Sequence, residues 1–381
     1  MSQAARIFAG IPATNRTLFH RIRFSVGDPV AILEQGDERT LILRDIEMER
    51  AKAKARVQHV HCPADFTPSG GLSGDRETAT AQALAECLVQ KGIQAVDVDR
   101  SLPHSFLYEL DQRNIESRYN PDLGVAERRA KDDQEIEWLA KAQAVTADTM
   151  TRACQLVARA TASADGILQH DGTPLTSERL QTLIDVWLLE AKFSNPGSIV
   201  AGGPEAADCH NHGSGPLATG QPIIIDIFPC DNQTYYNGDC TRTVVHGDIP
   251  DAVVAMHAAV AAAKQAGTTA TRPGVTGESV HQATIDCIQQ AGFLAERPSG
   301  PMTNEIPSMT HGTGHGIGLD VHEPPLLDFK GPILVRGDAL TIEPGLYSPA
   351  IGGVRLEDLV VVTYSGCQSL NADLAEGLDW R

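Results

Sequence analysis

The second half of the chain places acidic side chains inside or beside apolar, β-branched stretches, and this pattern limits the possible folds more than any other feature. Asp226 ends the run Ile223-Ile224-Ile225, and Glu357 lies within Val354 to Val360. Burying a carboxylate is costly unless it is paired or bound to a cation. We therefore expect strands that bring several ligands to one cation-binding point. In chain order the candidate ligands are Asp226, Asp239, His315, Glu343 and Glu357.

The contexts of these residues favour a catalytic site over a structural one. A hairpin through Pro229 to Gly238 would bring Asp226 and Asp239 together, and glycine-dense backbone around His315 suits close approach to a metal or substrate. Oxygen-rich ligands with one imidazole favour pairs of Mn, Co, Fe or Zn ions over a tetrahedral structural zinc. Two such ions, roughly 3.5–4 Å apart, share a bridging hydroxide and polarise a carbonyl, which suits hydrolysis of an amide.

Length, charge and cysteine content exclude several other classes of protein. A chain of 381 residues exceeds one comfortable core, so we expect two domains. A net charge of −18 disfavours nucleic acid and anionic membranes as partners. We expect a cytoplasmic protein, because the sequence shows neither an apolar leader nor a run of about 18 apolar residues. Its eight cysteines form no CxxC pair and are expected to be reduced.

Hydrophobic periodicity divides the chain near residue 127, into domains 1–127 and 128–381. In the first, a strand–turn–strand pattern at 31–43 and a helix–strand pattern at 77–98 predict a small α/β domain. In the second, the strands that hold the acidic residues alternate with helices, which predicts an α+β domain with helices covering a curved antiparallel sheet. The helices expected there span Lys131 to Val157, Ser177 to Lys192, Asp251 to Ala266 and Glu278 to Ala291.

Residues 128–370 resemble the pita-bread metallopeptidase family, which holds prolidases, aminopeptidase P, methionine aminopeptidases and creatinase. The motifs that carry the resemblance are Asp226, Asp239-x-Thr-Arg-Thr, His311-Gly-x-Gly-His315, Asp320-Val-His322-Glu, Glu343-Pro-Gly-Leu-Tyr and Arg355-Leu-Glu357-Asp. The resemblance implies a pita-bread fold that binds two divalent metal ions, Mn or Co before Zn or Fe. It also implies that Asp226 chelates one metal, that Asp239 and Glu357 bridge both, and that His315 and Glu343 complete the other shell. Glu343 would also shuttle the proton.

By the same resemblance, further residues bind substrate or stabilise the tetrahedral intermediate. His322 would hold the substrate near the scissile bond, and a histidine upstream of Asp226 would stabilise the intermediate. Both His210 and His212 fit that position; we favour His210 and keep His212 as a substrate-binding candidate. His311 would line the pocket for the residue after the scissile bond, or else serve by hydrogen bonding within the protein. The remaining candidates for substrate binding are Arg355 and Lys330, and the alternative for Lys330 is a solvated loop lysine.

The N-terminal domain resembles the creatinase-type N-domain by its length and its order of strands and helices. It therefore indicates the prolidase and aminopeptidase P branch, whose substrates carry proline after the cleaved bond. The expected partners are short proline-containing peptides and a second copy of the chain in a homodimer. Creatinase-like hydrolysis of a small amide and a non-catalytic peptide-binding scaffold are the alternatives, and the intact ligand set argues against both. Whether dipeptides or longer peptides are preferred stays open, and Ile227-Phe228-Pro229 differs from the small residues of many relatives.

Overall fold

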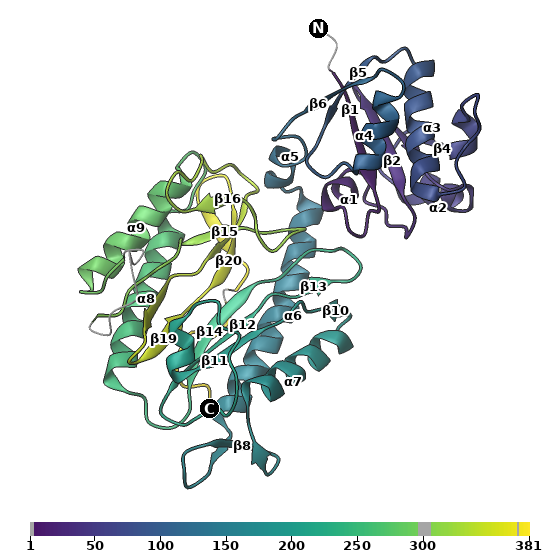
Figure 1. The fold of residues 1–381 in the computed structure, drawn as a ribbon. Coiled ribbons are helices and arrows are strands. Elements are labelled where there is room, and N and C mark those ends of the chain that lie inside the picture. Colours follow the sequence, from purple (N-terminus) through teal and green to yellow (C-terminus); the bar gives the residue numbers. More distant parts are fainter. Residues whose placement is uncertain (1–3, 296–305, 372) are drawn as a thin grey trace. The chain divides into compact units, whose positions relative to one another are not determined.

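A computed structural model describes residues 4–295, 306–371 and 373–381 of the chain, drawn as a ribbon in Figure 1. The chain divides after Arg128 into two compact units, Met1–Arg128 and Arg129–Arg381. None of the helices in the described ranges combines the length and the apolar character needed to cross a membrane.

The first unit is a six-stranded mixed sheet with helices on both faces. Its strand order is β4-β3-β2-β1-β5-β6, and β1 pairs antiparallel with β2 but parallel with β5. The strands are β1 (Ala5–Gly10), β2 (Val30–Gln35), β3 (Glu38–Ile42), β4 (His59–His61), β5 (Ala95–Val98) and β6 (Glu116–Tyr119). The helices are α1 (Arg16–Ile22), α2 (Met48–Lys54), α3 (Arg76–Gln90) and α4 (His104–Asp111), and the short α5 (Ala126–Arg129) includes the point at which the chain divides. The strand–turn–strand pattern predicted at 31–43 is confirmed as the β2–β3 hairpin.

Alternation along the central strands explains why helices cover both faces of this sheet. Ile7 and Leu33 pack in the core that α3 and α4 complete, whereas their chain neighbours Phe8 and Ile32 pack with α1 in a second core. Successive side chains of a strand point to opposite faces, so a strand that is apolar on both sides needs a cover on each. The expected α/β character of this part of the chain is confirmed.

The second unit holds four long helices that enclose antiparallel sheets between them (Figure 1). Helices α6 (Asp133–Ala158) and α7 (Ser177–Glu190) contact the strands of one sheet, and α8 (Asp251–Ala270) and α9 (Gly277–Gln290) contact those of the other. Each of the four predicted helices is therefore present, with shifts of a few residues at its ends. The largest shift is at α8, which continues to Ala270.

The strands of this unit form two main sheets. A three-stranded sheet has the order β11-β12-β14, from β11 (Ile199–Gly202), β12 (Pro222–Ile227) and β14 (Cys240–Val245). A five-stranded sheet has the order β16-β15-β17-β20-β21, from β15 (Gly314–Gly316), β16 (Glu323–Leu327), β17 (Ala339–Ile342), β20 (Asp358–Val362) and β21 (Cys367–Ser369). Smaller pairings join β18 (Gly345–Ser348) to β19 (Gly352–Arg355) and β10 (Phe193–Ser194) to β13 (Cys230–Asp231); β7 (Thr161–Ala162), β8 (Leu168–His170) and β9 (Thr173–Pro174) form a third.

Local chemistry fixes where α6 begins. Asp132 is its N-cap and accepts a hydrogen bond from the Glu135 backbone, while the Glu135 carboxylate accepts one from the Asp132 backbone. This reciprocal capping satisfies two main-chain donors that a helix end otherwise leaves open. The buried face of α6 then packs with α7 against β12 and β14. In this way α6 becomes a fixed support behind the first two candidate ligands.

Candidate metal and substrate site

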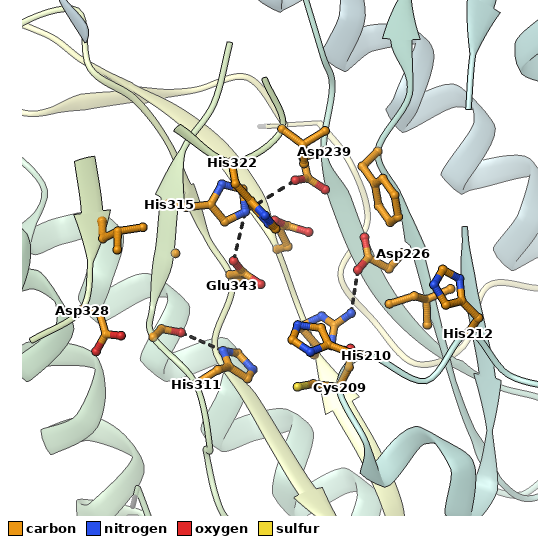
Figure 2. A pocket seen from close by; sticks show the side chains of 18 residues that line it. Cys209, His210, His212, Asp226, Asp239, His311, His315, His322, Asp328 and Glu343 are labelled. Carbon is orange, nitrogen blue, oxygen red and sulfur yellow. Dashed lines mark hydrogen bonds and ion pairs between the residues drawn. The ribbon is translucent and has the colours of Figure 1, made fainter. Parts of the chain in front are cut away.

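A cavity of about 570 Å³ opens in the second unit, and all five predicted ligands line it. Figure 2 shows Asp226 and Asp239 on one side and His315, His322 and Glu343 on the other. The histidines predicted for substrate binding or catalysis line the same cavity, as does Arg355, whereas Lys330 is not among its lining residues. The complete lining comprises Ile199, Cys209, His210, His212, Asp226, Phe228, Asp239, His311, Gly312, Gly314, His315, Val321, His322, Leu326, Asp328, Glu343, Arg355 and Glu357.

The predicted hairpin supplies the first two acidic residues. Strands β12 and β14 pair antiparallel, with Asp226 opposite Thr241, and Asp239 stands directly before β14. The connecting loop is held from outside: Lys141 of α6 forms a 2.7 Å ion pair with the buried Asp231. The Asn237 backbone also donates to the Gly318 carbonyl at 2.9 Å. A loop longer than a tight turn therefore still delivers both carboxylates to one point.

His315 is oriented by its own main chain. Its Nδ1 lies 3.1 Å from the Gly316 carbonyl oxygen, so the proton belongs on Nδ1 and Nε2 is left to accept. That Nε2 lies 3.7 Å from Asp239 Oδ2 and 3.4 Å from Glu343 Oε1 (Figure 2). A neutral imidazole aimed at two carboxylates is the arrangement of a metal ligand.

The remaining two carboxylates stand at interruptions of strands. Glu343 follows the end of β17, and Glu357 occupies the break between β19 and β20 rather than the continuous strand expected from its sequence. The Glu357 backbone donates to the Thr241 carbonyl at 3.0 Å, and the Thr241 hydroxyl donates to Glu357 Oε2 at 2.8 Å. The other oxygen, Oε1, stays available to a cation.

The ligand atoms of Asp239, His315 and Glu357 lie within 4.8 Å of one another, and all three residues are buried. The structure also offers an orphaned ligand atom, because Asp226 Oδ1 is buried without a hydrogen-bond partner in the described residues. Several carboxylate oxygens and one imidazole match the preference of hard or borderline divalent cations. The residues present therefore fit the metal ions that the family resemblance implies.

The pKa shifts of the acidic residues also indicate a cation-binding site. Burial raises the pKa of Asp239 well above its usual range, and the charges of Glu357 and Asp226 add to that effect. Burial also raises the pKa of Glu357, with Glu343 and Asp226 contributing next. Burial raises the pKa of Glu343 to about 7, although Arg355 opposes the shift. Buried acidic groups that repel one another indicate a site that can bind cations.

Arg355 is engaged inside this cluster. Its Nη2 lies 2.6 Å from Asp226 Oδ2, and its Nη1 donates to the Tyr347 hydroxyl at 3.0 Å and to the Cys209 carbonyl at 3.2 Å. Burial works against its charge, but Tyr347 and Asp226 raise the pKa of Arg355. The guanidinium thus orients Asp226, and the substrate-binding role predicted for it competes with these contacts.

His311 has protein partners at both ring nitrogens. Nδ1 lies 2.8 Å from the Gly312 carbonyl oxygen, and Nε2 lies 2.7 Å from the Tyr347 hydroxyl. Burial, followed by the charge of Arg355, lowers the pKa of His311 to about 4, so the ring is neutral near pH 7. This geometry favours the alternative role, in which His311 supports Tyr347 and Arg355 by hydrogen bonding.

Three exposed histidines face the cavity more freely. His322 stacks edge-on against His315 with ring centroids 4.2 Å apart. The cavity walls desolvate the His322 ring and lower its pKa, and the neighbouring His315 acts in the same direction. His210 also lowers the pKa of His322 and of His311, which brings its ring into the same electrostatic neighbourhood. His212 lies apart from them in Figure 2, with its Nδ1 3.3 Å from the Ser198 carbonyl oxygen.

The structure adds residues that the sequence interpretation left without a role. Thr241 orients Glu357, Tyr347 joins His311 to Arg355, and Cys209 lines the cavity. Thr241 and Tyr347 stand inside the quoted motifs, which was a usable signal. Lys330 is exposed and has a left-handed backbone conformation with φ 62°, so the geometry gives no support to a substrate-binding role for it.

Comparison with known proteins identifies the second unit. The model of metallopeptidase family M24 matches residues 138–364. A probable dipeptidase, PepE, of Mycobacterium tuberculosis is 39% identical over 178 residues, which cover 45% of this chain and 43% of that protein. The match thus spans less than half the length of these first curated relatives. An Xaa-Pro dipeptidase of Pyrococcus horikoshii is 27% identical over 285 residues, covering 74% of each chain.

Among solved structures, the X-Pro aminopeptidase of Thermotoga maritima superposes with a TM-score of 0.77 at 22% identity. The superposition covers 96% of this chain and 95% of that one. At this identity the likeness shows the fold. The expected pita-bread fold is therefore confirmed, together with the smaller domain that precedes it.

Proposed function

The chain belongs to metallopeptidase family M24, and from that premise we propose that it is a metal-dependent exopeptidase that cleaves the bond before proline. Its substrates would be dipeptides or short peptides that begin with Xaa-Pro. The observation that carries the proposal is the convergence of the three-ligand group Asp239, His315 and Glu357 with Asp226 and Glu343 in one cavity. A scaffold that only binds peptides has no need for four converging carboxylates, which are costly to bury.

We propose that the five residues hold a pair of divalent ions, Mn or Co before Zn or Fe. When bound, such a pair activates water at neutral pH and polarises the peptide carbonyl. The chain's contribution is to fix the ligands beforehand. His315 is oriented through the Gly316 carbonyl, Glu357 through Thr241, and Asp226 through Arg355.

Glu343 is the proposed proton carrier. In the metal-free protein, burial raises the pKa of Glu343 to about 7 against the opposing charge of Arg355, so this carboxylate binds a proton more readily than an ordinary glutamate. Thr341 donates to Glu343 Oε1 at 3.3 Å, which holds one oxygen in place. The carboxylate takes a proton from the attacking water and returns it to the leaving prolyl nitrogen.

His322 and His210 are proposed to bind the substrate carbonyl and the oxyanion that develops from it. Both line the cavity, and His322 lies against the ligand His315. Donors placed where negative charge develops lower the barrier of acyl transfer. His212 remains the alternative to His210. His311 and Arg355 act by holding Tyr347 and Asp226 in place.

The preference for proline is carried over from relatives whose names specify it, including the Xaa-Pro dipeptidase of P. horikoshii. The chain also carries a first unit of mixed α/β architecture, as expected for the prolidase and aminopeptidase P branch. We further propose that the protein acts in the cytoplasm as a homodimer. Neither nucleic acid nor a membrane is proposed as a partner, given the net charge of −18.

The test is hydrolysis of an Xaa-Pro dipeptide and an Xaa-Pro-Yaa tripeptide by metal-stripped protein, with and without added Mn²⁺ or Co²⁺. We expect release of the first residue only after metal is added. The ratio of kcat/KM for the two lengths assigns the enzyme to the dipeptidase or the aminopeptidase type. Matched peptides with alanine in place of proline serve as the specificity control.

Two outcomes would contradict the proposal. Equal cleavage of the alanine and proline peptides would remove the specificity for proline. Absence of turnover on every peptide, with two metal ions bound per chain, would favour a small non-peptide amide as the substrate.

A further inference from the structure

We propose that Gln143 and Asn371 are positioning residues that hold the two central carboxylates, Asp239 and Glu357, at the separation that a metal pair requires. The inference rests on the proposed metal site and goes beyond it, because neither residue lines the cavity. Both act on the main chain behind the ligands. Neither belongs to the motifs that carry the family resemblance.

The Gln143 side chain forms hydrogen bonds with both main-chain polar groups of Asp239. Its Nε2 donates to the Asp239 carbonyl at 2.7 Å, and its Oε1 accepts from the Asp239 backbone N–H at 2.9 Å. The side chain is fully buried, at 0% exposure, on the face of α6 that packs against β14. A carboxamide that matches both polar groups of one residue fixes its position and orientation together.

Asn371 extends these hydrogen bonds to the strand that follows Glu357. Its Oδ1 accepts from Gln143 Nε2 at 2.9 Å and from the Leu359 backbone N–H at 2.8 Å. Leu359 lies on β20, two residues beyond Glu357. One pair of side-chain amides therefore connects the main chain at Asp239 with the main chain at Leu359.

This connection joins two strands that are not hydrogen-bonded to each other in a sheet. Strands β14 and β20 belong to separate sheets, so regular strand pairing does not set their register within the described residues. The direct links around Glu357 depend mostly on side chains: the Glu357 backbone donates to the Thr241 carbonyl, the Thr241 hydroxyl donates to the Glu357 carboxylate, and Arg242 donates to the Glu357 carbonyl at 2.6 Å and to Asp358 Oδ1 at 2.7 Å. Between two sheets that approach without pairing, a buried amide pair can supply the register that a ladder supplies within one.

Asn371 lies beyond the family match, which ends at residue 364, and its carbonyl accepts from the Leu374 backbone at 2.9 Å. The Ala375 carbonyl accepts from Arg242 Nε at 2.8 Å, and the Leu378 carbonyl accepts from the Val245 backbone at 3.0 Å. Leu378 and Trp380 are buried in two core clusters. The C-terminal segment is therefore packed and hydrogen-bonded against the strand that follows Asp239.

The experiment compares full-length, metal-stripped wild type with Gln143→Met and Asn371→Leu, which keep the approximate shape and remove the hydrogen bonds. Leu180→Ala is the matched control, because Leu180 is fully buried in the core beside α6 and does not line the cavity. Calorimetric titration with Mn²⁺ gives affinity and stoichiometry, thermal unfolding of the metal-free form gives stability, and Co²⁺ absorption reports ligand geometry.

We expect Gln143→Met and Asn371→Leu to weaken Mn²⁺ binding roughly 10–100-fold, the usual effect of removing a partner that orients a metal ligand. Their Co²⁺ spectra should change in shape. Leu180→Ala should lose thermal stability and keep both the wild-type affinity and the wild-type spectrum.

Wild-type Mn²⁺ affinity and Co²⁺ spectra in both variants would overturn the inference. An equal loss of affinity in Leu180→Ala would also overturn it, since the effect would then follow general destabilisation. Two bound Mn²⁺ ions without Xaa-Pro hydrolysis in the wild type would contradict the proposed function alone. The inference is judged on affinity and spectra.

Discussion

Two buried glutamates, one in each unit, occupy opposite electrostatic surroundings. Glu34 on β2 and Glu357 beside β20 are each 2% exposed. Glu34 is surrounded by three arginines: Arg6 Nη2 lies 2.9 Å from Oε2, and Arg39 Nε and Arg21 Nε lie 3.1 and 3.9 Å from Oε1. Glu357 instead shares its space with other carboxylates, whose charges help to raise its pKa after the effect of burial.

The comparison separates a structural carboxylate from a ligand. The charge of Glu34 is neutralised by the chain's own cations, so its burial serves the fold. Around Glu357 the cation in contact with the acidic cluster is Arg355, whose ion pair is with Asp226. Among the described residues Arg355 is paired with one of four carboxylates, so the ionised cluster keeps an excess of negative charge that bound metal ions would balance. A buried acid whose buried neighbours are also acids is a candidate for metal binding, whereas one surrounded by arginines is not.

The strongest test of this contrast is removal of the metal ions. Chelation should lower Xaa-Pro hydrolysis at least about 1,000-fold, which corresponds to the several kcal/mol that metal ions contribute to the transition state. Asp239→Asn should do the same and should resist rescue by added Mn²⁺. Hydrolysis assays with metal analysis provide the measurement. Full activity after chelation would mean that the acidic cluster works without metal.

Glu34→Gln tests the structural side of the contrast. Removing the negative charge leaves three arginines close together without their common partner, so the free energy of unfolding should fall by about 3 kcal/mol. That value is the lower end for a broken buried ion pair, because Arg6 and Arg39 stay partly exposed. Denaturant unfolding measures it, with Mn²⁺ affinity as the control. Weakened metal binding would show that the two sites are coupled.

The pH dependence of the metal-free protein sharpens the comparison further. Burial raises the folded pKa of Glu343 to about 7, above its ordinary 4.5. A raised carboxyl pKa contributes stability that is fully present below the unfolded pKa and is lost as the pH rises through the folded value. Between pH 4.5 and pH 7.5 this group should therefore cost the metal-free protein up to about 3 kcal/mol of unfolding free energy.

The measurement is the difference between wild type and Glu343→Gln in denaturant unfolding across this pH range. The variant should lack the Glu343 contribution, and saturating Mn²⁺ should make the wild type more stable as the pH rises, because metal binds the deprotonated ligands. A difference between the two proteins that does not change with pH would contradict a raised pKa.

Glu357→Gln gives the smallest effect, and its sign is opposite to that of Glu34→Gln. Replacing one member of a repelling cluster by a neutral amide should raise the unfolding free energy of the metal-free protein by about 1 kcal/mol. The amide oxygen still accepts from Thr241, so the hydrogen bond that holds the side chain is kept. Thermal unfolding in the presence of a chelator measures the change. A destabilised variant would mean that the acid is structural.

The comparison also shows which parts of the fold the sequence could predict. Periodic helices such as α6 and α7 were predicted with errors of a few residues, because an apolar stripe at helical spacing persists over many turns. The hairpin that carries Asp226 was predicted from another local signal, because two short apolar runs are joined by the turn-forming stretch from Pro229 to Gly238. The interruption between β19 and β20 at Glu357 was not predicted, because the residues around it have the sequence pattern of one continuous strand.

In the candidate site, too, the sequence indicated one part and not the other. The ligand set was visible as acidic residues in apolar surroundings, a local signal. The support of the ligands was not visible, because Arg355 meets Asp226 from 129 positions away and Gln143 meets Asn371 from 228. Nothing local distinguishes a glutamine on a helix that faces solvent from one that clamps a peptide group.

By itself, then, the sequence determined the family, the fold and the candidate metal ligands, because these depend on residue type and spacing along the chain. Only the tertiary structure decided which partner each ligand has. It paired Asp226 with Arg355, engaged both nitrogens of His311, and joined two unpaired sheets through Gln143 and Asn371. Such contacts form between segments that are distant in the chain, and their geometry exists only once both sheets are packed.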